Sequence, residues 1–189
     1  MLFFDRRPEP VTGTPRWAVL AAWATVWCVI PSAVWRSAAG LGAGLGMSDE
    51  WRELQGIPGP GTVYVLSLSV LSIVFASLTL GLVYPWGERV PARVPLIGGR
   101  RYPTWLVVAL VVAGVVPLAV IVVMSAASWD VLLGVAGRPS PGWVMLATAC
   151  YLPAALWPGL VVAVTVAYVR RRAQGRAPAP GAPAVRETA

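Results

Sequence analysis

Four long runs of apolar residues, none containing a charged side chain, dominate the chain. They cover residues 17–35, 62–84, 104–127 and 143–169. Each run reaches or exceeds the roughly 18 uncharged residues that mark a helix crossing a hydrocarbon core of about 30 Å. A soluble amphipathic helix would show polar residues at the helical period, and these runs do not. The pattern predicts an all-α protein, a four-span transmembrane helical bundle with spans at about 17–38, 62–84, 104–127 and 143–169.

The remaining segments complete the predicted organisation. Residues 1–16 form an N-terminal tail, and residues 17–172 form the transmembrane domain. Residues 173–189 are rich in Ala, Pro and Gly, have nothing to bury, and are predicted to be a disordered tail. The first run could instead be a signal peptide, cleaved after SAAG at residues 37–40, but its length and its tryptophans favour a membrane span.

The placement of arginine predicts the orientation, because lysine is absent. Four spans put twelve of the fifteen arginines on one side, in the two tails and in the loop between the second and third spans. The other side holds only Arg36, Arg52 and Arg138. Cytoplasmic segments of membrane proteins carry such an excess of positive charge. Both termini are therefore expected to be cytoplasmic, and the isoelectric point of 10.4 reflects topology rather than nucleic-acid binding.

A short amphipathic helix is expected in the first outer loop, lying on the membrane surface. Ser48 can cap it, and Asp49 and Glu50 suit the positive end of its dipole. Arg36, at the outer end of the first span, is the one ionisable residue close to membrane depth. It could snorkel to the headgroups, form an outer ion pair with Asp49, Glu50 or Glu53, or, as the third choice, bind an external anion.

The stretch YPWGERVPARVPLIGGRRYP, at residues 84–103, is a candidate anion site. Its prolines stiffen the loop, and its glycine pair can expose backbone N–H groups beside arginines, which suits phosphate or an anionic lipid headgroup. The topology already explains positive charge here, so a charged turn is the favoured interpretation. The candidate anion- or lipid-binding residues are Arg89, Arg93, Gly98, Gly99, Arg100 and Arg101.

Small residues recur at helical spacing in two spans. The second span carries Ser69, Ser72, Ala76 and Thr79, and the fourth carries Ala155, Gly159, Ala163 and Ala167. Such residues let helices approach closely in lipid, so packing is favoured over a polar solute pathway. Each proline within a span is expected to kink its helix; these are Pro31, Pro117, Pro153 and Pro158.

The sequence lacks most catalytic and metal-binding chemistry. It has no histidine, which excludes His-based triads and zinc-peptidase motifs. Its two cysteines, Cys28 and Cys150, do not form a closely spaced pair and are read as small buried residues. No predicted span contains the carboxylate that proton or cation coupling requires. The protein is therefore expected not to be an enzyme and to hold no metal or cofactor.

Four segments carry a resemblance to a known kind of protein: PSAVWR at 31–36, MSDEW at 47–51, IPGPGTVYVLSLS at 57–69 and LTLGLVYPWGERVPARVPLIGGRRYP at 78–103. They resemble a family of uncharacterised four-helix integral membrane proteins of high-GC actinobacteria. The absence of Lys, Asn and His agrees with such a genome. The resemblance implies a multi-pass bacterial plasma-membrane protein and carries over no catalytic residue.

Two classes of function follow. The first is a structural or accessory protein of a membrane complex, which would bind a membrane-protein partner or a second copy of itself. The alternative is a binder or carrier of an anionic lipid or small solute, using Arg36 outside and the arginines of the 84–103 loop inside. A continuous polar cavity between the spans would favour the second class, and a filled core the first.

Overall fold

The computed structural model describes residues 9–88, 102–135 and 139–174, and the regular elements among them are all helical. Four helical segments are long and apolar enough to cross a membrane, which confirms the predicted number of apolar spans. They are α1 (Arg16–Gly40), α3 (Pro60–Leu78) continued by the 3₁₀ helix η1 (Thr79–Leu82), α4 (Thr104–Ala127), and a fourth span of α6 (Pro141–Tyr151), η3 (Leu152–Leu156) and α7 (Trp157–Gln174) in series. Shorter helices connect them: α2 (Asp49–Leu54), η2 (Pro85–Gly87) and α5 (Trp129–Val135).

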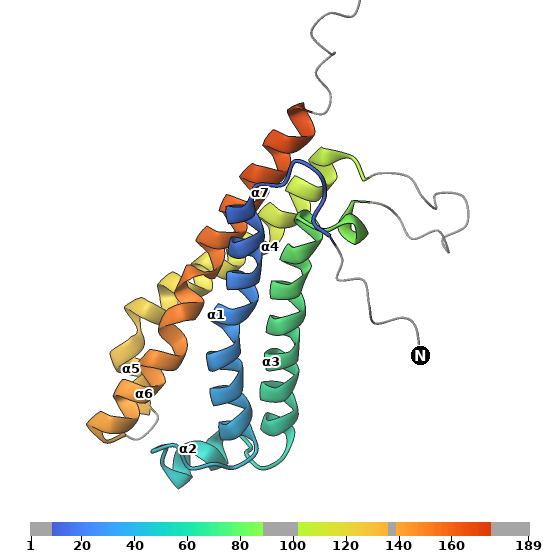
Figure 1. The fold of residues 1–189 in the computed structure, drawn as a ribbon. Coiled ribbons are helices and arrows are strands. Elements are labelled where there is room, and N and C mark those ends of the chain that lie inside the picture. Colours follow the sequence, from blue (N-terminus) through green and yellow to red (C-terminus); the bar gives the residue numbers. More distant parts are fainter. Residues whose placement is uncertain (1–8, 89–101, 136–138, 175–189) are drawn as a thin grey trace, which may run out of the picture.

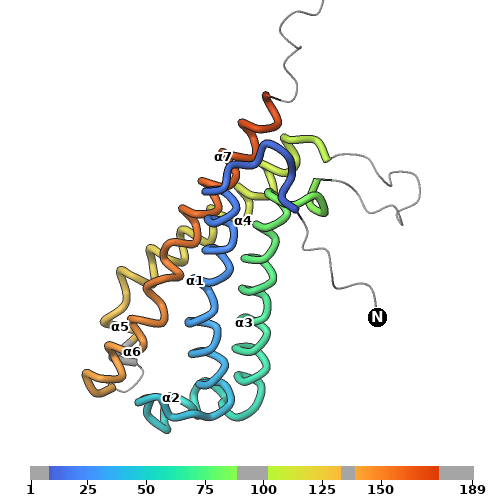
Figure 2. Tube along the Cα trace, in the orientation of Figure 1, coloured from blue at the N-terminus to red at the C-terminus, as the bar shows by residue number. Residues whose placement is uncertain are grey.

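The bundle has two distinct ends (Figure 1). α1 begins and α7 ends at the same end, here named the terminal end, and α2 lies at the opposite end, here named the α2 end. The trace in Figure 2 shows α1 running between α3 and the fourth span. α1 is therefore the central helix of the bundle.

Small side chains explain the central position of α1. Its buried residues are mostly small and recur at three- and four-residue steps: Ala18, Ala22, Thr25, Cys28, Val29, Ser32, Ala33, Ala39 and Gly40, with Trp35 beside them. Apolar burial between helices gives little driving force in lipid, so close van der Waals contact decides which helices associate. At the α2 end a Cβ on Gly40 would lie 3.3 Å from Val65, and the Thr62 hydroxyl donates to the Gly40 carbonyl over 2.7 Å.

The small residues of α3 pack as predicted. Ser69, Ala76 and Thr79 are buried, and Ser72 is half-buried. The hydroxyls of Ser69 and Ser72 donate to carbonyls one turn earlier in the same helix, over 2.9 and 2.7 Å. Hydroxyls satisfied within their own helix do not need water, so these serines do not mark a polar pathway.

The small-residue stripe predicted in the fourth span is not a buried face. Ala167 is buried, but Ala155 and Gly159 are exposed, and nothing lies within 4 Å of a Cβ built on Gly159. A repeat of four residues drifts by about 40° per step in a helix of 3.6 residues per turn, so the two ends of this stripe face different ways. The buried positions of α7 are Val161, Val164, Thr165, Ala167 and Tyr168, at the three- and four-residue steps that keep one face.

The prolines within the spans have unequal local effects. α1 and α4 continue as α-helix through Pro31 and Pro117. In the fourth span, Pro153 lies in η3 and Pro158 in the first turn of α7, so the α-helix is interrupted by 3₁₀ geometry near mid-span. Proline removes a backbone donor and clashes with the preceding turn, and two of them five residues apart make this interruption favourable.

α4 stands apart from the rest of the bundle. It buries no residue, and it packs mainly against α7 rather than α3. It carries small residues too, among them Ala109, Ala113 and Gly114, but none of them is buried against a neighbouring helix as the small residues of α1 are. The consequence is a space between α3 and α4.

At the α2 end, α2 begins after Ser48, whose hydroxyl accepts the N–H of Trp51 over 3.2 Å. Asp49 and Glu50 occupy its first turn, as expected for a helix N-terminus. Trp35 of α1 and Trp143 of α6 meet edge to face nearby, with ring centroids 6.1 Å apart. The position of α2 on a membrane surface stays a prediction.

Candidate functional site

A half-open cavity of about 1340 Å³ lies between α1, α3, α4 and the fourth span, and some of its lining side chains, such as Phe75 and Leu110, are more than half exposed. Its walls are mainly apolar, with Leu68 and Phe75 contributed by α3 and Leu110 and Leu118 by α4. It exists because α3 and α4 do not pack closely on each other. Gly114 of α4 also lines it, and no atom lies within 4 Å of a Cβ built there. A continuous polar cavity would have favoured a binder or carrier, and a filled core a structural protein. The observed cavity is mainly apolar and matches neither expectation.

Arg36 lines this cavity, together with the polar side chains of Ser72 and Tyr151. Its Nη2 donates to the Ser72 hydroxyl over 3.2 Å, and that hydroxyl in turn donates to the Leu68 carbonyl. The Arg36 Nε–H is buried and has no hydrogen-bond partner among the described residues. The phenol of Tyr151, from α6, lies near the guanidinium. A cation therefore faces an apolar cavity with neutral groups as its neighbours.

The direction of the Arg36 side chain follows from helix geometry. Every Cα–Cβ bond in a helix tilts toward the N-terminus, and α1 begins at the terminal end. The side chain accordingly points back into the bundle rather than out toward the α2 end. Ser72, its partner, lies twelve residues after Pro60 and ten before Leu82, which is about 18 and 15 Å from the two ends of that span. The side chain donates to Ser72 within the bundle, and the snorkelling of Arg36 to the headgroups stays a prediction.

The structure does not bring Arg36 to the acids predicted as its partners. Asp49 pairs with Arg52 one turn away on α2, and Glu50 and Glu53 are exposed on the same helix. Arg52 also donates to the Gly42 carbonyl over 3.2 Å. Within residues 9–88, 102–135 and 139–174, no ion pair includes Arg36.

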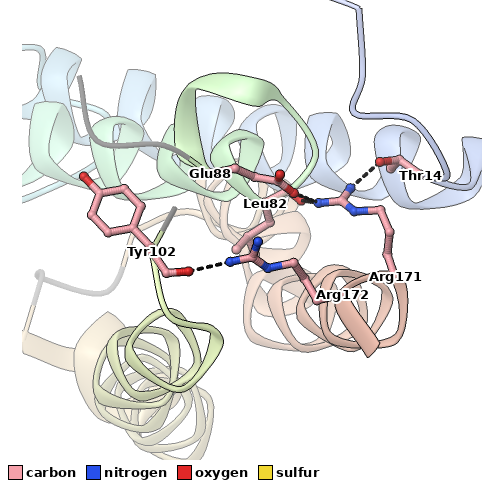
Figure 3. Close-up of polar contacts among 6 residues, drawn as sticks. All are labelled: Thr14, Leu82, Glu88, Tyr102, Arg171 and Arg172. Atoms are coloured by element: carbon pink, nitrogen blue, oxygen red, sulfur yellow. Dashed lines mark hydrogen bonds and ion pairs between the residues drawn. The ribbon is translucent and has the colours of Figure 1, made fainter. Parts of the chain in front are cut away.

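A second polar cluster joins all four spans at the terminal end (Figure 3). Arg171, near the end of α7, pairs with Glu88 and donates to the Thr14 hydroxyl and, over 3.2 Å, to the Leu82 carbonyl. The neighbouring Arg172 donates to the Tyr102 carbonyl, just before α4. These partners belong to the segments that flank α1, α3 and α4. Two adjacent arginines thus tie the end of the fourth span to the other three.

The Arg171–Glu88 pair is buried, since each side chain is only 10% exposed. The guanidinium carbons of Arg171 and Arg172 lie 5.6 and 5.5 Å from the ring centroid of the buried Tyr168. The face of an aromatic ring attracts cations, which adds to the ion pair. Sequence reasoning missed this cluster, because it treated the arginines after the fourth span only as topological charge.

A close glycine contact brings Glu88 to Arg171. In GLVYPWGE, at residues 81–88, the chain turns back so that η2 packs against η1. A Cβ added to Gly87 would lie 2.1 Å from the Gly81 carbonyl oxygen, so only glycine fits. The N–H of Tyr102 then donates to the Glu88 carbonyl over 3.2 Å, which holds the start of the next span to this turn.

The predicted anion-binding residues of the 84–103 stretch lie outside the described residues. This applies to Arg89, Arg93, Gly98, Gly99, Arg100 and Arg101. Their role as an anion site or as a charged turn stays a prediction. Only the two ends of the stretch, from Tyr84 to Glu88 and at Tyr102 and Pro103, are described, and these belong to the arginine cluster just given.

The cysteines and acids of the described segments do not assemble a metal or redox centre. Cys28 is buried in α1 and donates to the Thr25 carbonyl over 3.1 Å, and Cys150 is half-buried in α6. Neither is disulfide-bonded. No group of three or more His, Cys, Asp or Glu side chains is close enough to hold a metal ion within the described part of the chain.

Comparison of the chain with protein-family models, with curated proteins and with solved structures found no match.

Proposed function

We propose that the protein is a membrane-embedded lipid-binding protein that holds an amphiphile in the cavity between α1, α3, α4 and the fourth span. The observation that carries this proposal is the cavity itself, with a volume of about 1340 Å³ and mainly aliphatic and aromatic walls. The volume exceeds the roughly 300–1,000 Å³ of common ligand pockets, because this space is open on part of its surface. Water is a poor occupant of apolar cavities, whereas the hydrocarbon chain of a lipid fills such a space without losing hydrogen bonds.

The hydroxyl groups of the bundle argue against a polar solute as the ligand. Of the hydroxyls that line the cavity, those of Ser32, Ser72 and Thr148 each donate to a carbonyl three or four residues earlier in their own helix. A polar solute needs unsatisfied donors and acceptors along its path. The apolar walls supply few of them, so the bulk of the ligand is apolar.

The proposed setting is a bacterial plasma membrane with both termini in the cytoplasm. Twelve of the fifteen arginines support this orientation through the excess of positive charge expected on the cytoplasmic side. In this orientation α2 and the Trp35–Trp143 pair face the outside. Arg36 then reaches the cavity from the outer side, and the Arg171 cluster lies at the cytoplasmic surface.

A pair of matched glycine substitutions tests lipid binding. Gly114→Phe places a large ring in the cavity, and Gly159→Phe makes the same change on the exposed face of α7, outside the cavity. Both sites have nothing within 4 Å of a Cβ, so neither ring meets a neighbouring atom at its first carbon. We expect lipid retained through purification in mild detergent, measured by native mass spectrometry, to fall in Gly114→Phe and to stay at the parent level in Gly159→Phe. Equal retention in both variants would contradict the proposal.

A structural or accessory role is the second candidate, and one observation favours it. Gly159 is exposed on the fourth span, outside the cavity, with nothing within 4 Å of a Cβ built on it, and a small exposed residue lets another membrane helix approach closely. Gly159→Phe would then reduce co-purification of a second copy or a partner protein, without changing bound lipid. The two glycine variants therefore separate the two functions.

A further inference from the structure

Arg36 is the one feature of the cavity that an apolar chain does not explain. A guanidinium stays charged in proteins, with a pKa above about 12. Arginine within a membrane span is rare and pairs with other polar groups or lines a functional cavity. Here its hydrogen-bond partner is the neutral hydroxyl of Ser72, and its buried Nε–H has none among the described residues.

We infer that Arg36, held in place by the Ser72 hydroxyl and joined by Tyr151, binds the anionic headgroup of the lipid in the cavity, and that this headgroup is a phosphate ester. The inference rests on the proposed lipid-binding function and gives its ligand a chemical class. A guanidinium donates two parallel hydrogen bonds to phosphate oxygens. The Tyr151 phenol can donate a third, because it lies near the guanidinium and lines the same cavity.

The position of Arg36 favours a lipid over free phosphate. Beyond the guanidinium the cavity continues along α3 and α4 to Trp86 and Tyr102 at the terminal end. From Ser72 to Thr79, both of which line it, the α3 axis advances by about 10 Å. A small anion would occupy only the space beside Arg36 and leave this apolar length empty. A phosphate ester with hydrocarbon chains would place its phosphate beside Arg36 and its chains along this apolar length.

The geometry also separates this site from the 84–103 stretch. Arg36 approaches the cavity from the α2 end and points back into the bundle, whereas residues 84–88 and 102–103 lie at the terminal end. A headgroup at Arg36 is therefore bound within the span, beneath the Trp35–Trp143 pair. The general attraction of cytoplasmic arginines for anionic lipid does not produce binding at this place.

The test measures headgroup preference rather than total lipid. The full chain is reconstituted in vesicles of equal phosphatidylglycerol and phosphatidylcholine, extracted in mild detergent, and its bound lipids are measured by native mass spectrometry. We expect the parent protein to retain phosphatidylglycerol in preference. Arg36→Gln should reduce that preference by about tenfold or more, because a hydrogen bond to a charged group contributes about 1.5–3 kcal/mol and this variant removes the charged donor. Arg52→Gln, the same change at a residue of α2 that does not line the cavity, should leave it unchanged.

Milder variants guard against a folding defect. Tyr151→Phe removes only the phenol hydroxyl and should lower the preference severalfold, and Arg36→Lys keeps the charge and should retain part of it. An unchanged preference in both Arg36→Gln and Tyr151→Phe would overturn the inference while leaving lipid binding intact. Release of the lipid by millimolar inorganic phosphate would identify free phosphate as the ligand and would also overturn it. Absence of retained lipid from the parent protein would remove the proposed function itself.

Discussion

The buried Arg171–Glu88 pair allows a quantitative prediction about stability. Glu88 is 8% exposed, and the Arg171 guanidinium also donates to the Thr14 hydroxyl and the Leu82 carbonyl. Arg171→Gln removes the cation and leaves the carboxylate buried without its partner. Breaking a buried ion pair in this way costs about 3–5 kcal/mol. For a chain of this size that corresponds to a fall in Tm of about 6–20 °C.

Thermal unfolding in mild detergent, followed by tryptophan fluorescence, measures the effect. Arg170→Gln is the matched control, because Arg170 is the adjacent residue and is exposed; its expected effect is within about 0.5 kcal/mol. Glu88→Gln combined with Arg171→Gln completes a double-mutant cycle, in which contacting residues show coupling of about 0.5–3 kcal/mol. Equal Tm values for Arg170→Gln and Arg171→Gln, or strictly additive losses in the cycle, would refute the argument that the pair holds the terminal end together.

Two further predictions concern topology and the glycine turn. Reporter fusions after Gly56 and Arg138 should report the outside and fusions after Val94 and Gln174 the cytoplasm, because four spans put twelve of the fifteen arginines in the two tails and the loop between the second and third spans; a cytoplasmic signal at Gly56 would contradict this topology. Gly87→Ala should lower stability by about 1–3 kcal/mol, the usual effect of forced overpacking, since its Cβ would lie 2.1 Å from the Gly81 carbonyl oxygen, whereas Gly159→Ala meets no atom within 4 Å. Thermal unfolding of both variants checks this, and equal midpoints would contradict the close contact.

The partners of the arginines could not be predicted from the sequence. Arg36 was expected to face outward, to the acids of the following loop, because those residues are close in sequence. Its helix direction instead turns the side chain toward Ser72, thirty-six positions later. Arg171 likewise finds Glu88 and Thr14, eighty-three and one hundred and fifty-seven positions away. Contacts of this kind depend on how each helix is rotated, and apolar composition carries no information about rotation.

Sequence reasoning was likewise only partly able to predict which small-residue stripe of a helix is buried. The stripe on α3 alternates steps of three and four, stays on one face and is buried mainly against α1. The stripe on the fourth span repeats every four residues, drifts around the helix and leaves Gly159 exposed. The central role of α1 could have been anticipated from its own small residues at mixed steps, which sequence reasoning did not consider.

The sequence by itself determined the helical class, the number of apolar spans and the cap of α2, because these depend on local properties: the length of an uncharged run and the hydrogen bond of one serine. The tertiary structure alone decided where the space in the bundle lies. Every span is apolar around most of its surface, so lipid satisfies each face almost equally, and small differences in close packing choose the neighbours. α1 packs on α3 and α7 through small residues, α4 packs on α7 and not closely on α3, and the cavity and the environment of Arg36 follow from that difference.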